Sequence, residues 1–346
     1  MVSTNLGEIM RSEIAEIPAV FQKLSDQIPA ITKQIDALSL TNIDSVILVA
    51  RGTSDNAALF LKYLIETKIG IPCGLASPSV VTIYKSKLKF TNCLVIGLSQ
   101  SGQSPDIVTY TKAAKAGGAK SISLTNDPES PLAKATDLHL YLEAGAEKAV
   151  AATKSYSAEL LLSYILVSAW AKESINLNNL IAATKNSVGN LAEVESVVSN
   201  FDHKNGITTM GRGFAYANAQ ECALKIQETL KIPVSSFSSA DYLHGPISSL
   251  TENSRVIFVA PSGVAVESMQ TTVNRIREIT KHIYWIGNGF TVNAGEVSIG
   301  GATGLTEPES VIADSVVLQQ FAMSLAVKNN LNPDAPVGLL KVTQTI

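Results

Sequence analysis

Hydroxyl-bearing side chains follow two short apolar runs in the first half of the chain. Gly52-Thr53-Ser54 comes after the run at 45–50, and Ser99-Gln100-Ser101-Gly102-Gln103-Ser104 comes after the run at 93–98. Each segment precedes a helix-like stretch, whose free backbone N–H groups and positive dipole end suit a phosphate. Serine is also a good helix cap, so capping explains either loop alone equally well. Two such loops in one sheet favour phosphate, because their helix starts can converge on one ligand.

Residues suited to proton transfer lie in the second half. Glu221, Lys225 and Glu228 are spaced by four and three, which puts them on one helix face. Spacing alone favours a solvated ion-pair stripe, and the functional alternative is a general base with an electrostatic partner. His244 precedes Gly245-Pro246 in a predicted turn. A lone loop histidine is usually a surface residue, yet its ordinary titration near neutrality also suits proton transfer.

Lys341 lies near the end of the chain, directly after two leucines. A lysine in a tail is normally solvated. An amine beside apolar residues could instead form a Schiff base with a sugar carbonyl. The residues around Lys341 alone favour the solvated lysine, and only a resemblance to a known family would favour the Schiff base.

Alternating strands and helices must position these residues, and the alternation occurs twice. Predicted strands lie at 45–50, 93–98, 121–124 and 138–142, and again at 207–210, 255–260 and 283–286. This order predicts parallel sheets covered by helices on both faces. Gly52 and Gly213 are 161 residues apart, as are Gly102 and Gly263. The helix pattern at 155–170 likewise has a counterpart at 315–330, so the offset indicates a duplicated domain.

The flanking segments complete the predicted organisation. Residues 8–38 have helical spacing, with Pro18 and Pro29 expected to break it or to start turns. We therefore expect a helical arm at 1–40, a first domain at 41–175 and a second domain at 200–346, with a polar linker near 172–200.

Composition excludes several classes of function. The 346 residues are 46% hydrophobic and 16% charged, and the net charge of −3 argues against a nucleic-acid surface. The three cysteines are far apart and form no CxxC pair, so neither a zinc site nor a disulfide framework is expected. The N-terminus lacks the features of a signal peptide, and the apolar stretch at 160–170 is too short to span a bilayer. A cytoplasmic protein without a membrane partner is expected.

Six segments, in order, resemble the SIS (sugar isomerase) domain family, and in particular the isomerase module of glutamine-dependent glucosamine-6-phosphate synthase. They are Arg51–Asp55, Ser99–Ser104, Val150–Lys154, Glu221–Glu228, His244–Pro246 and Leu340–Lys341. They span about residues 40–346, and each is weak alone. The resemblance implies two tandem SIS domains, each a doubly wound, flavodoxin-like three-layer α/β/α fold, with the tail of the second closing over the site.

The resemblance also implies a role for each matching residue. The residues that would hold the phosphate and nearby hydroxyls are Thr53, Ser54, Ser99, Gln100, Ser101 and Ser104. Val150 and Ala152 would line the sugar site, with Lys225 beside it. Glu228 would move a proton between C1 and C2, and Lys341 would contact the substrate. His244 would help open the ring, and because it comes from the neighbouring subunit in this family, a homodimer is implied.

The expected reaction runs towards ammonia release. The chain begins Met1-Val2-Ser3, without the synthase's N-terminal catalytic cysteine, so we expect no ammonia source of its own. Glucosamine 6-phosphate and water would give fructose 6-phosphate and ammonia, without a metal, nucleotide or redox cofactor. The alternatives are a galactosamine-6-phosphate deaminase, a fructosamine-6-phosphate deglycase and a non-catalytic sugar-phosphate sensor.

Two departures from the family pattern leave the identity of the sugar open. A difference between the loops of the two halves sets these halves apart. Gln103 and Ala152 stand where the family usually has Glu and Ser, and both lie at the implied sugar site. The loops at 211–214 and 261–264 are poorer in hydroxyls than their counterparts. We expect the second copy to have lost its own phosphate site while supplying Glu228 and His244 to the working one.

Overall fold

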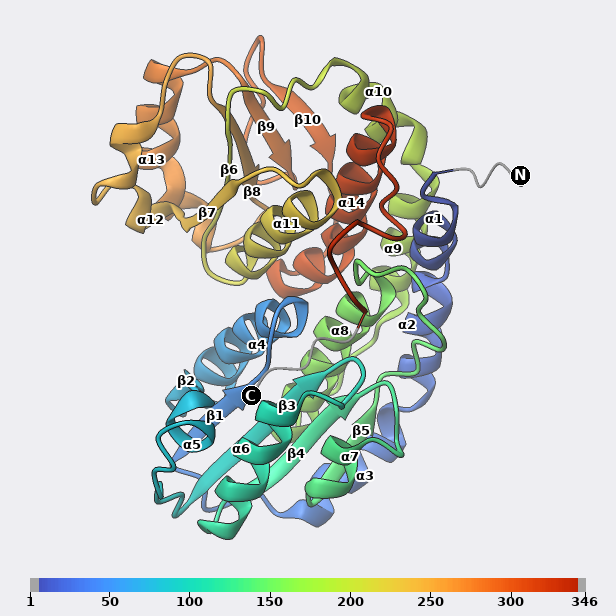
Figure 1. Ribbon diagram of the computed structural model, residues 1–346, viewed down its shortest axis with the longest axis vertical. Coiled ribbons are helices and arrows are strands. Elements are labelled where there is room, and N and C mark those ends of the chain that lie inside the picture. The colour runs from blue at the N-terminus through green and yellow to red at the C-terminus, as the bar shows by residue number, and fades with distance from the viewer. Residues whose placement is uncertain (1–5, 342–346) are drawn as a thin grey trace. The chain divides into compact units, whose positions relative to one another are not determined.

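The computed structural model describes residues 6–341, which fold into two compact units, each built around a five-stranded parallel sheet (Figure 1). The first unit contains residues 19–147, 154–176 and 340–341. The second contains residues 6–18, 148–153 and 177–339. The predicted α/β class with two tandem parallel sheets is confirmed.

The first unit is doubly wound around the strand order β2-β1-β3-β4-β5. Its strands are β1 Ser45–Val49, β2 Cys73–Leu75, β3 Cys93–Ser99, β4 Lys120–Thr125 and β5 Leu138–Tyr141. Helix α4 (Thr53–Leu64) ends in a π-turn at Ile65–Ile69 and leads from β1 to β2, whereas α6 (Pro105–Ala116) leads from β3 to β4. These connections leave in opposite directions, so the winding reverses between β1 and β3.

Helices cover both faces of this first sheet. One layer combines α4 with α3 (Ile28–Leu38) and α8 (Lys154–Trp170), which pack against one another. The other layer combines α6 with α5 (Ser79–Thr82) and α7 (Pro131–Ala135) (Figure 1). Apolar side chains of β1 and β3, such as Val49 and Val95, pack in one core cluster with Ile107 and Tyr110 of α6.

The second unit repeats this topology with the strand order β10-β9-β8-β6-β7. Its strands are β6 Ile207–Gly211, β7 Val234–Ser238, β8 Arg255–Val259, β9 Ile283–Ile286 and β10 Val297–Gly300. Its helices are α9 Asn178–Gly189, α10 Leu191–Asn200, α11 Ala215–Leu230, α12 Ser239–Tyr242, α13 Ala265–Ile279 and α14 Glu307–Lys328, with a 3-10 turn at Pro246–Ser249. The winding reverses between β6 and β8, which follows from the duplication.

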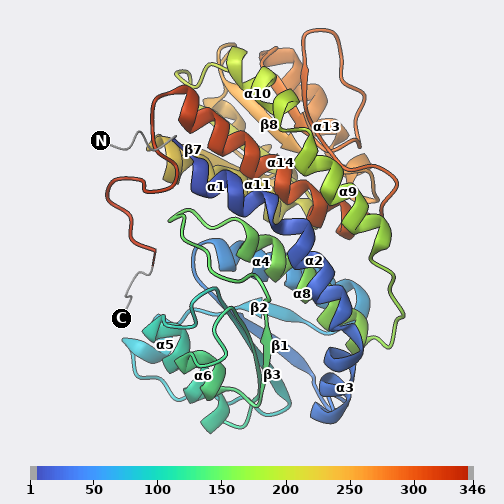
Figure 2. The ribbon, with the colours of Figure 1, turned by 90° about the vertical axis from the view of Figure 1, so that its right-hand side faces the viewer.

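The N-terminal segment forms three helices, α1 (Glu8–Ala15), α2 (Ile17–Asp26) and α3. Pro18 and Pro29 are the second residues of α2 and α3, where a proline costs no helical hydrogen bond. Helix α1 packs on α14 in the second unit and α3 packs on α8 in the first (Figure 2). Helices α9 and α10, in the segment expected to be a linker, pack against α14.

Three strands escaped prediction, and all three are edge strands: β2, β7 and β10. They contain Gly or Ser in place of a continuous apolar run, and much of their surface is not buried. The predicted start of the last helix at 315 was also wrong. Helix α14 begins at Glu307, where Thr306 and Glu309 form a reciprocal capping box.

Each unit contains one long, almost fully buried helix, α8 in the first and α14 in the second. All residues of α8 except Trp170 are buried, which confirms the buried helix predicted at 160–170. Helix α14 is long and apolar enough to cross a membrane by length and composition alone. However, 94% of its apolar window is buried inside the fold, as expected for a core helix.

Candidate active site

In the first unit, two helices begin at the point where the winding of the sheet reverses. Strands β1 and β3 are neighbours, and α4 and α6 begin directly after them. The cap positions are Gly52, which has no side chain, and Ser104, whose hydroxyl makes no capping bond. Neither cap side chain therefore bonds a first-turn N–H group, although in α6 the Ile107 N–H donates to the Asp106 Oδ1 at 2.9 Å. In open α/β sheets this edge, at the switch point, is where ligands bind.

The loop at 99–104 is folded by its own hydroxyls. The Ser99 Oγ accepts a hydrogen bond from the Gly102 N–H at 3.1 Å, and the Ser101 Oγ accepts one from the Gln103 N–H at 3.3 Å. Gly102 has φ 61°, and a Cβ placed there would lie 2.3 Å from the Ser130 Oγ. This position therefore requires glycine for two reasons, backbone conformation and space.

An ion pair joins the two loops. The Arg51 Nε lies 2.8 Å from the Asp106 Oδ2, and the carboxylate is almost fully buried while the guanidinium is half exposed. The pair fixes the start of α4 relative to the start of α6. The sequence interpretation assigned neither residue a role, although Arg51 lies in a matching segment and Asp106 follows Ser104 by two positions.

The predicted phosphate ligands differ in what their side chains do. Thr53, Gln100, Ser101 and Ser104 are partly exposed around the two helix starts, while Ser99 is buried. Ser54 is also buried, and its hydroxyl donates to the Glu159 carboxylate of α8 at 2.7 Å. This hydrogen bond links the start of α4 to α8.

The second unit buries a charged cluster on α11. The Lys225 ammonium lies 3.5 Å from the Glu221 Oε1 and also pairs with the Glu228 Oε2. Glu221 and Lys225 have no exposed side-chain surface, whereas Glu228 is 22% exposed. The solvated stripe favoured by spacing alone is therefore wrong. The structure presents one carboxylate at the surface with a buried cation behind it, as a general base with an electrostatic partner requires.

His244 is exposed on the turn after α12. The backbone N–H of His244 donates to the Asp241 carbonyl at 3.0 Å. Gly245, with φ 135°, turns the chain into the 3-10 turn at Pro246–Ser249. The imidazole is thus presented outward on a defined turn.

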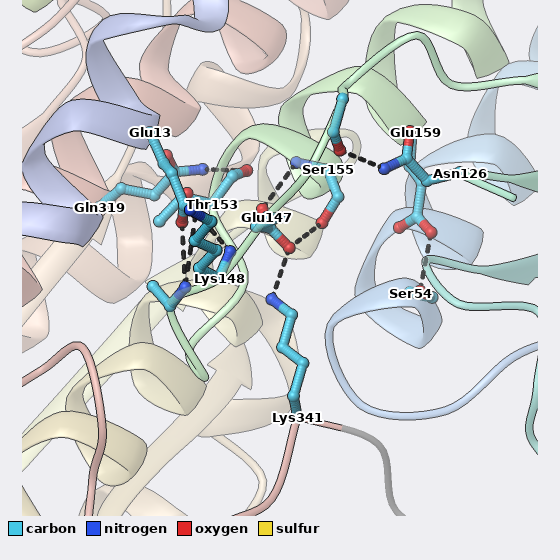
Figure 3. Close-up of polar contacts among 12 residues, drawn as sticks. Glu13, Ser54, Asn126, Glu147, Lys148, Thr153, Ser155, Glu159, Gln319 and Lys341 are labelled. Carbon is cyan, nitrogen blue, oxygen red and sulfur yellow. Dashed lines mark hydrogen bonds and ion pairs between the residues drawn. The ribbon is translucent and has the colours of Figure 1, made fainter.

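The loop carrying Val150 and Ala152 is held by elements of the second unit (Figure 3). The buried Glu13 carboxylate of α1 accepts from the Ala149 N–H at 3.3 Å and from the Lys148 N–H. The Asp334 carbonyl accepts from the Val150 N–H at 2.9 Å, and the Gln319 amide donates to the Thr153 carbonyl at 3.0 Å. The N-terminal helix thus fixes the backbone beside two predicted substrate contacts.

Lys341 ends the described part of the chain in an ion pair. Its Nζ lies 2.7 Å from the Oε2 of the buried Glu147, a residue that sequence interpretation did not single out (Figure 3). A signal was nevertheless present, because Ser155 and Glu159 are among the polar residues of a mostly apolar helix. Ser155 donates to Glu147 itself, and Glu159, four residues further along α8, accepts from Ser54.

In the second unit, a carboxylate of the same unit lies at the start of α13, the helix that corresponds to α6. The Glu307 Oε2 lies 3.4 Å from the Ala265 N–H at the start of α13. A Cβ on Gly263 would lie 2.1 Å from the same oxygen. Burial raises the pKa of Glu307, and bonds from the Ala265 and Val264 N–H groups oppose that shift. The start of α13 therefore already has a carboxylate of the same chain beside it.

Neither thiols nor metal-ligand clusters add chemistry in the described part of the chain. Burial raises the pKa of Cys73 and of Cys222 to about 12, so neither thiol is a nucleophile at neutral pH. Within residues 6–341, no three His, Cys, Asp or Glu side chains gather as ligands of one metal ion would.

Comparison with known proteins places this geometry in a family. The SIS domain profile matches residues 39–169 and again residues 201–294. The chain belongs to the SIS domain family. The two matches fall on the two sheets, so each sheet unit is an SIS unit.

Relatives of this SIS protein include sugar-phosphate enzymes. It is 28% identical to the glutamine–fructose-6-phosphate aminotransferase (isomerizing) of Aquifex aeolicus, over 99% of this chain and 59% of that protein. The chain thus spans little more than half the length of such curated relatives. A structure described as a candidate phosphosugar isomerase from Silicibacter pomeroyi is 30% identical, with a TM-score of 0.79 and coverage of 94% and 99% of the two chains.

The same fold occurs in a glucosamine-6-phosphate deaminase from Thermotoga maritima. That structure has a TM-score of 0.70, an identity of 22%, and coverage of 94% of this chain and 99% of that one. At this identity the likeness concerns the fold. Within the fold, the first SIS unit holds the two hydroxyl-rich loops and Lys341, and the second holds Val150, Ala152, Lys225, Glu228 and His244.

Proposed function

We propose that the protein is an amino sugar phosphate isomerase that releases ammonia, converting glucosamine 6-phosphate and water to fructose 6-phosphate and ammonia. The observation that carries this proposal is the pair of open, hydroxyl-lined helix starts at the switch point of the first unit. The names of the relatives supply the substrate class, since they act on fructose 6-phosphate, glucosamine 6-phosphate and other phosphosugars.

The phosphate acts as a remote handle. N–H groups at the starts of α4 and α6, together with the hydroxyls of Thr53, Ser101 and Ser104, would bind its oxygens. The Arg51–Asp106 ion pair keeps these groups preorganised. Binding energy gained at the phosphate would then orient the reacting carbons.

Glu228 would carry the central proton transfer. In the opened sugar, its carboxylate takes the proton from C2 and returns it to C1, while the 2-amino group loses one proton and O1 gains one and becomes a hydroxyl. The product is an imine at C2. Water adds to that imine and ammonia leaves, which gives the ketose phosphate. Lys225, buried beside Glu228, offsets the negative charge of the carboxylate in its resting state.

Two further residues would complete the reaction. His244 would transfer a proton between O5 and O1 as the ring opens, and we propose that a second copy of the chain supplies it in a homodimer. Lys341 would contact the carbonyl end of the opened sugar. Both side chains are at least partly exposed, and both an imidazole and an amine can give and take a proton.

The test is an ammonia-release assay on the full chain with three substrates: glucosamine 6-phosphate, galactosamine 6-phosphate and a fructosamine 6-phosphate. We expect ammonia and fructose 6-phosphate in equal amounts from the first. Glu228→Gln should lower kcat by at least about a hundredfold, because a general base contributes that much or more. Activity on the third substrate alone, with release of an amine, would assign a deglycase.

The matched control is Glu278→Gln. Glu278 also lies in an i,i+3 ion pair on a helix of the second unit, with Arg275, but both side chains are well exposed. It should retain wild-type activity. Binding of the sugar phosphates without turnover of any of them would contradict the proposal and favour a sensor.

A further inference from the structure

The ion pair of Lys341 is anchored on a buried acid. The Lys341 Nζ lies 2.7 Å from the Glu147 Oε2, and the Glu147 side chain has no exposed surface, whereas Lys341 is 25% exposed (Figure 3). The neighbouring Leu340 is 78% exposed. Apolar burial of Leu340 therefore does little to hold residues 340–341, whereas the ion pair of Lys341 restrains them.

Glu147 is fixed independently of Lys341. Its Oε1 accepts from the Ser155 N–H at 3.0 Å, and its Oε2 accepts from the Ser155 hydroxyl at 2.7 Å. Ser155 is the second residue of the 17-residue helix α8. The N-terminus of a helix has unpaired N–H groups and positive dipole character, which stabilise a buried carboxylate. Burial without such bonds would be costly, so Glu147 is a preformed acceptor.

The same face of α8 also fixes the first phosphate loop. Glu159 follows Ser155 by four residues, which places both on one side of the helix, about one turn apart. The Glu159 Oε1 accepts from the hydroxyl of Ser54, the second residue of α4 and the neighbour of Thr53. Two consecutive turns of one buried helix thus hold the Lys341 anchor and the start of α4.

We infer that Glu147 is the positioning residue for Lys341. It holds the ammonium of Lys341 beside the first turn of α8, and the next turn of that helix holds the proposed phosphate-binding start of α4. This inference rests on the proposed function in that Lys341 acts on the sugar. Glu147 itself touches no reacting atom. It acts by fixing where the ammonium of Lys341 lies relative to the phosphate handle.

The first test is a double-mutant cycle in the full chain. Glu147→Gln should lower kcat on glucosamine 6-phosphate about tenfold or more, because misplacing a substrate contact by about an ångström has effects of this size. Competitive inhibition by inorganic phosphate should stay within about twofold of wild type, because the phosphate loops do not include Glu147. In a Lys341→Met background, Glu147→Gln should add less than a twofold further loss.

The matched control is Glu173→Gln, which breaks the Lys68–Glu173 ion pair in the same unit but on an exposed surface. It should leave kcat unchanged. Glu147→Asp, which keeps the charge on a shorter side chain, should recover part of the activity lost in Glu147→Gln. Additive effects of Glu147→Gln and Lys341→Met, or an unchanged kcat in Glu147→Gln, would overturn the inference.

The second test does not depend on turnover. Hydrogen–deuterium exchange of peptides that cover residues 334–341 should be faster in Glu147→Gln than in wild type. Lys341→Met should accelerate it to the same extent, and because Lys341 is partly exposed this variant should fold. If wild type releases no ammonia but both variants accelerate exchange, the proposed function fails and the anchor stands. Unchanged exchange in both variants refutes the anchor.

Discussion

Three buried carboxylates show how differently this fold stabilises an acid. Glu221 lies beside the ammonium of Lys225, and Glu147 lies at a helix N-terminus with Lys341 as its counter-ion. Asp314 of α14 has no exposed surface, and its Oδ1 accepts from the Ala302 N–H at 2.7 Å, while its Oδ2 has no hydrogen-bond partner within the described residues. Burial therefore raises the pKa of Asp314 to about 7.

This raised pKa predicts a pH-dependent stability of the second unit. Between the ordinary pKa of 3.8 and about 7, folded Asp314 keeps a proton that the unfolded chain has lost. Stability should therefore be full below pH 4 and should fall as pH rises towards 7, by up to about 4 kcal/mol for this group. Asp314→Asn should remove that slope and be the more stable protein at pH 8.

Urea midpoints between pH 5 and 8, followed by the fluorescence of buried Trp285 in the same unit, measure this effect. Asp26→Asn, at an exposed position of α2, serves as the control and should keep the wild-type slope. An identical pH slope in wild type and Asp314→Asn would mean that Asp314 is charged in the folded protein.

The sequence predicted which charged residues share a helix face, but not how deeply their side chains are buried. The spacing of Glu221, Lys225 and Glu228 placed them on one face, and the structure confirms that face. Spacing could not show that Lys225 is fully buried, because burial depends on helices remote in the chain. Glu147 was missed for the same reason: its partners, Ser155 and Lys341, lie 8 and 194 residues away.

At the scale of elements, the loop between β3 and α6 depends on one glycine. Gly102 has φ 61°, and an added Cβ would meet Ser130, whose Oγ caps α7 by accepting from the Ala133 N–H. Gly102→Ala should therefore cost about 1–2 kcal/mol for the left-handed backbone, and more for the clash and the disturbed cap. We expect both a lower Tm and at least about tenfold weaker binding of the sugar phosphate.

Gly145→Ala separates these two costs. Gly145 lies in the same unit with φ 65°, but nothing lies within 4 Å of an added Cβ. It should lose only the backbone contribution and should bind the sugar phosphate as wild type does. Calorimetry gives both quantities, and equal losses in the two variants would show that contact with Ser130 does not matter.

Central elements were more predictable than peripheral ones. The buried strands β1, β3 and β8 are continuous apolar runs, and each was predicted to within one residue at either end. The edge strands β2, β7 and β10 are half covered and carry Gly or Ser, so they lack that pattern. The start of α14 was hidden because its capping box, Thr306 with Glu309, precedes its most apolar stretch.

At the scale of the whole molecule, the exposed His244 leads to a prediction about assembly. If a second copy supplies His244, then His244→Ala and Glu228→Gln, each nearly inactive alone, should restore activity when mixed after unfolding and refolding together. Half of the dimers would be mixed, each with one intact site, so about a quarter of wild-type activity is expected. Ammonia release measures it.

The control for this mixing is Glu228→Gln combined with a chain that carries both substitutions, which cannot form an intact site. It should stay inactive. Failure of the first mixture to recover activity, with dimers present by light scattering, would place His244 and Glu228 of one site on the same chain.

Glu307 gives the duplicated fold a lasting asymmetry. A carboxylate tethered in the same chain has an effective concentration set by the fold, so dissolved phosphate would have to compete with it at the start of α13. The carboxylate reaches this position when the second unit folds, and it lies where a helix N-terminus favours negative charge. In the second unit a carboxylate of the chain itself therefore lies at the helix start whose counterpart in the first unit we propose to hold the phosphate of a substrate.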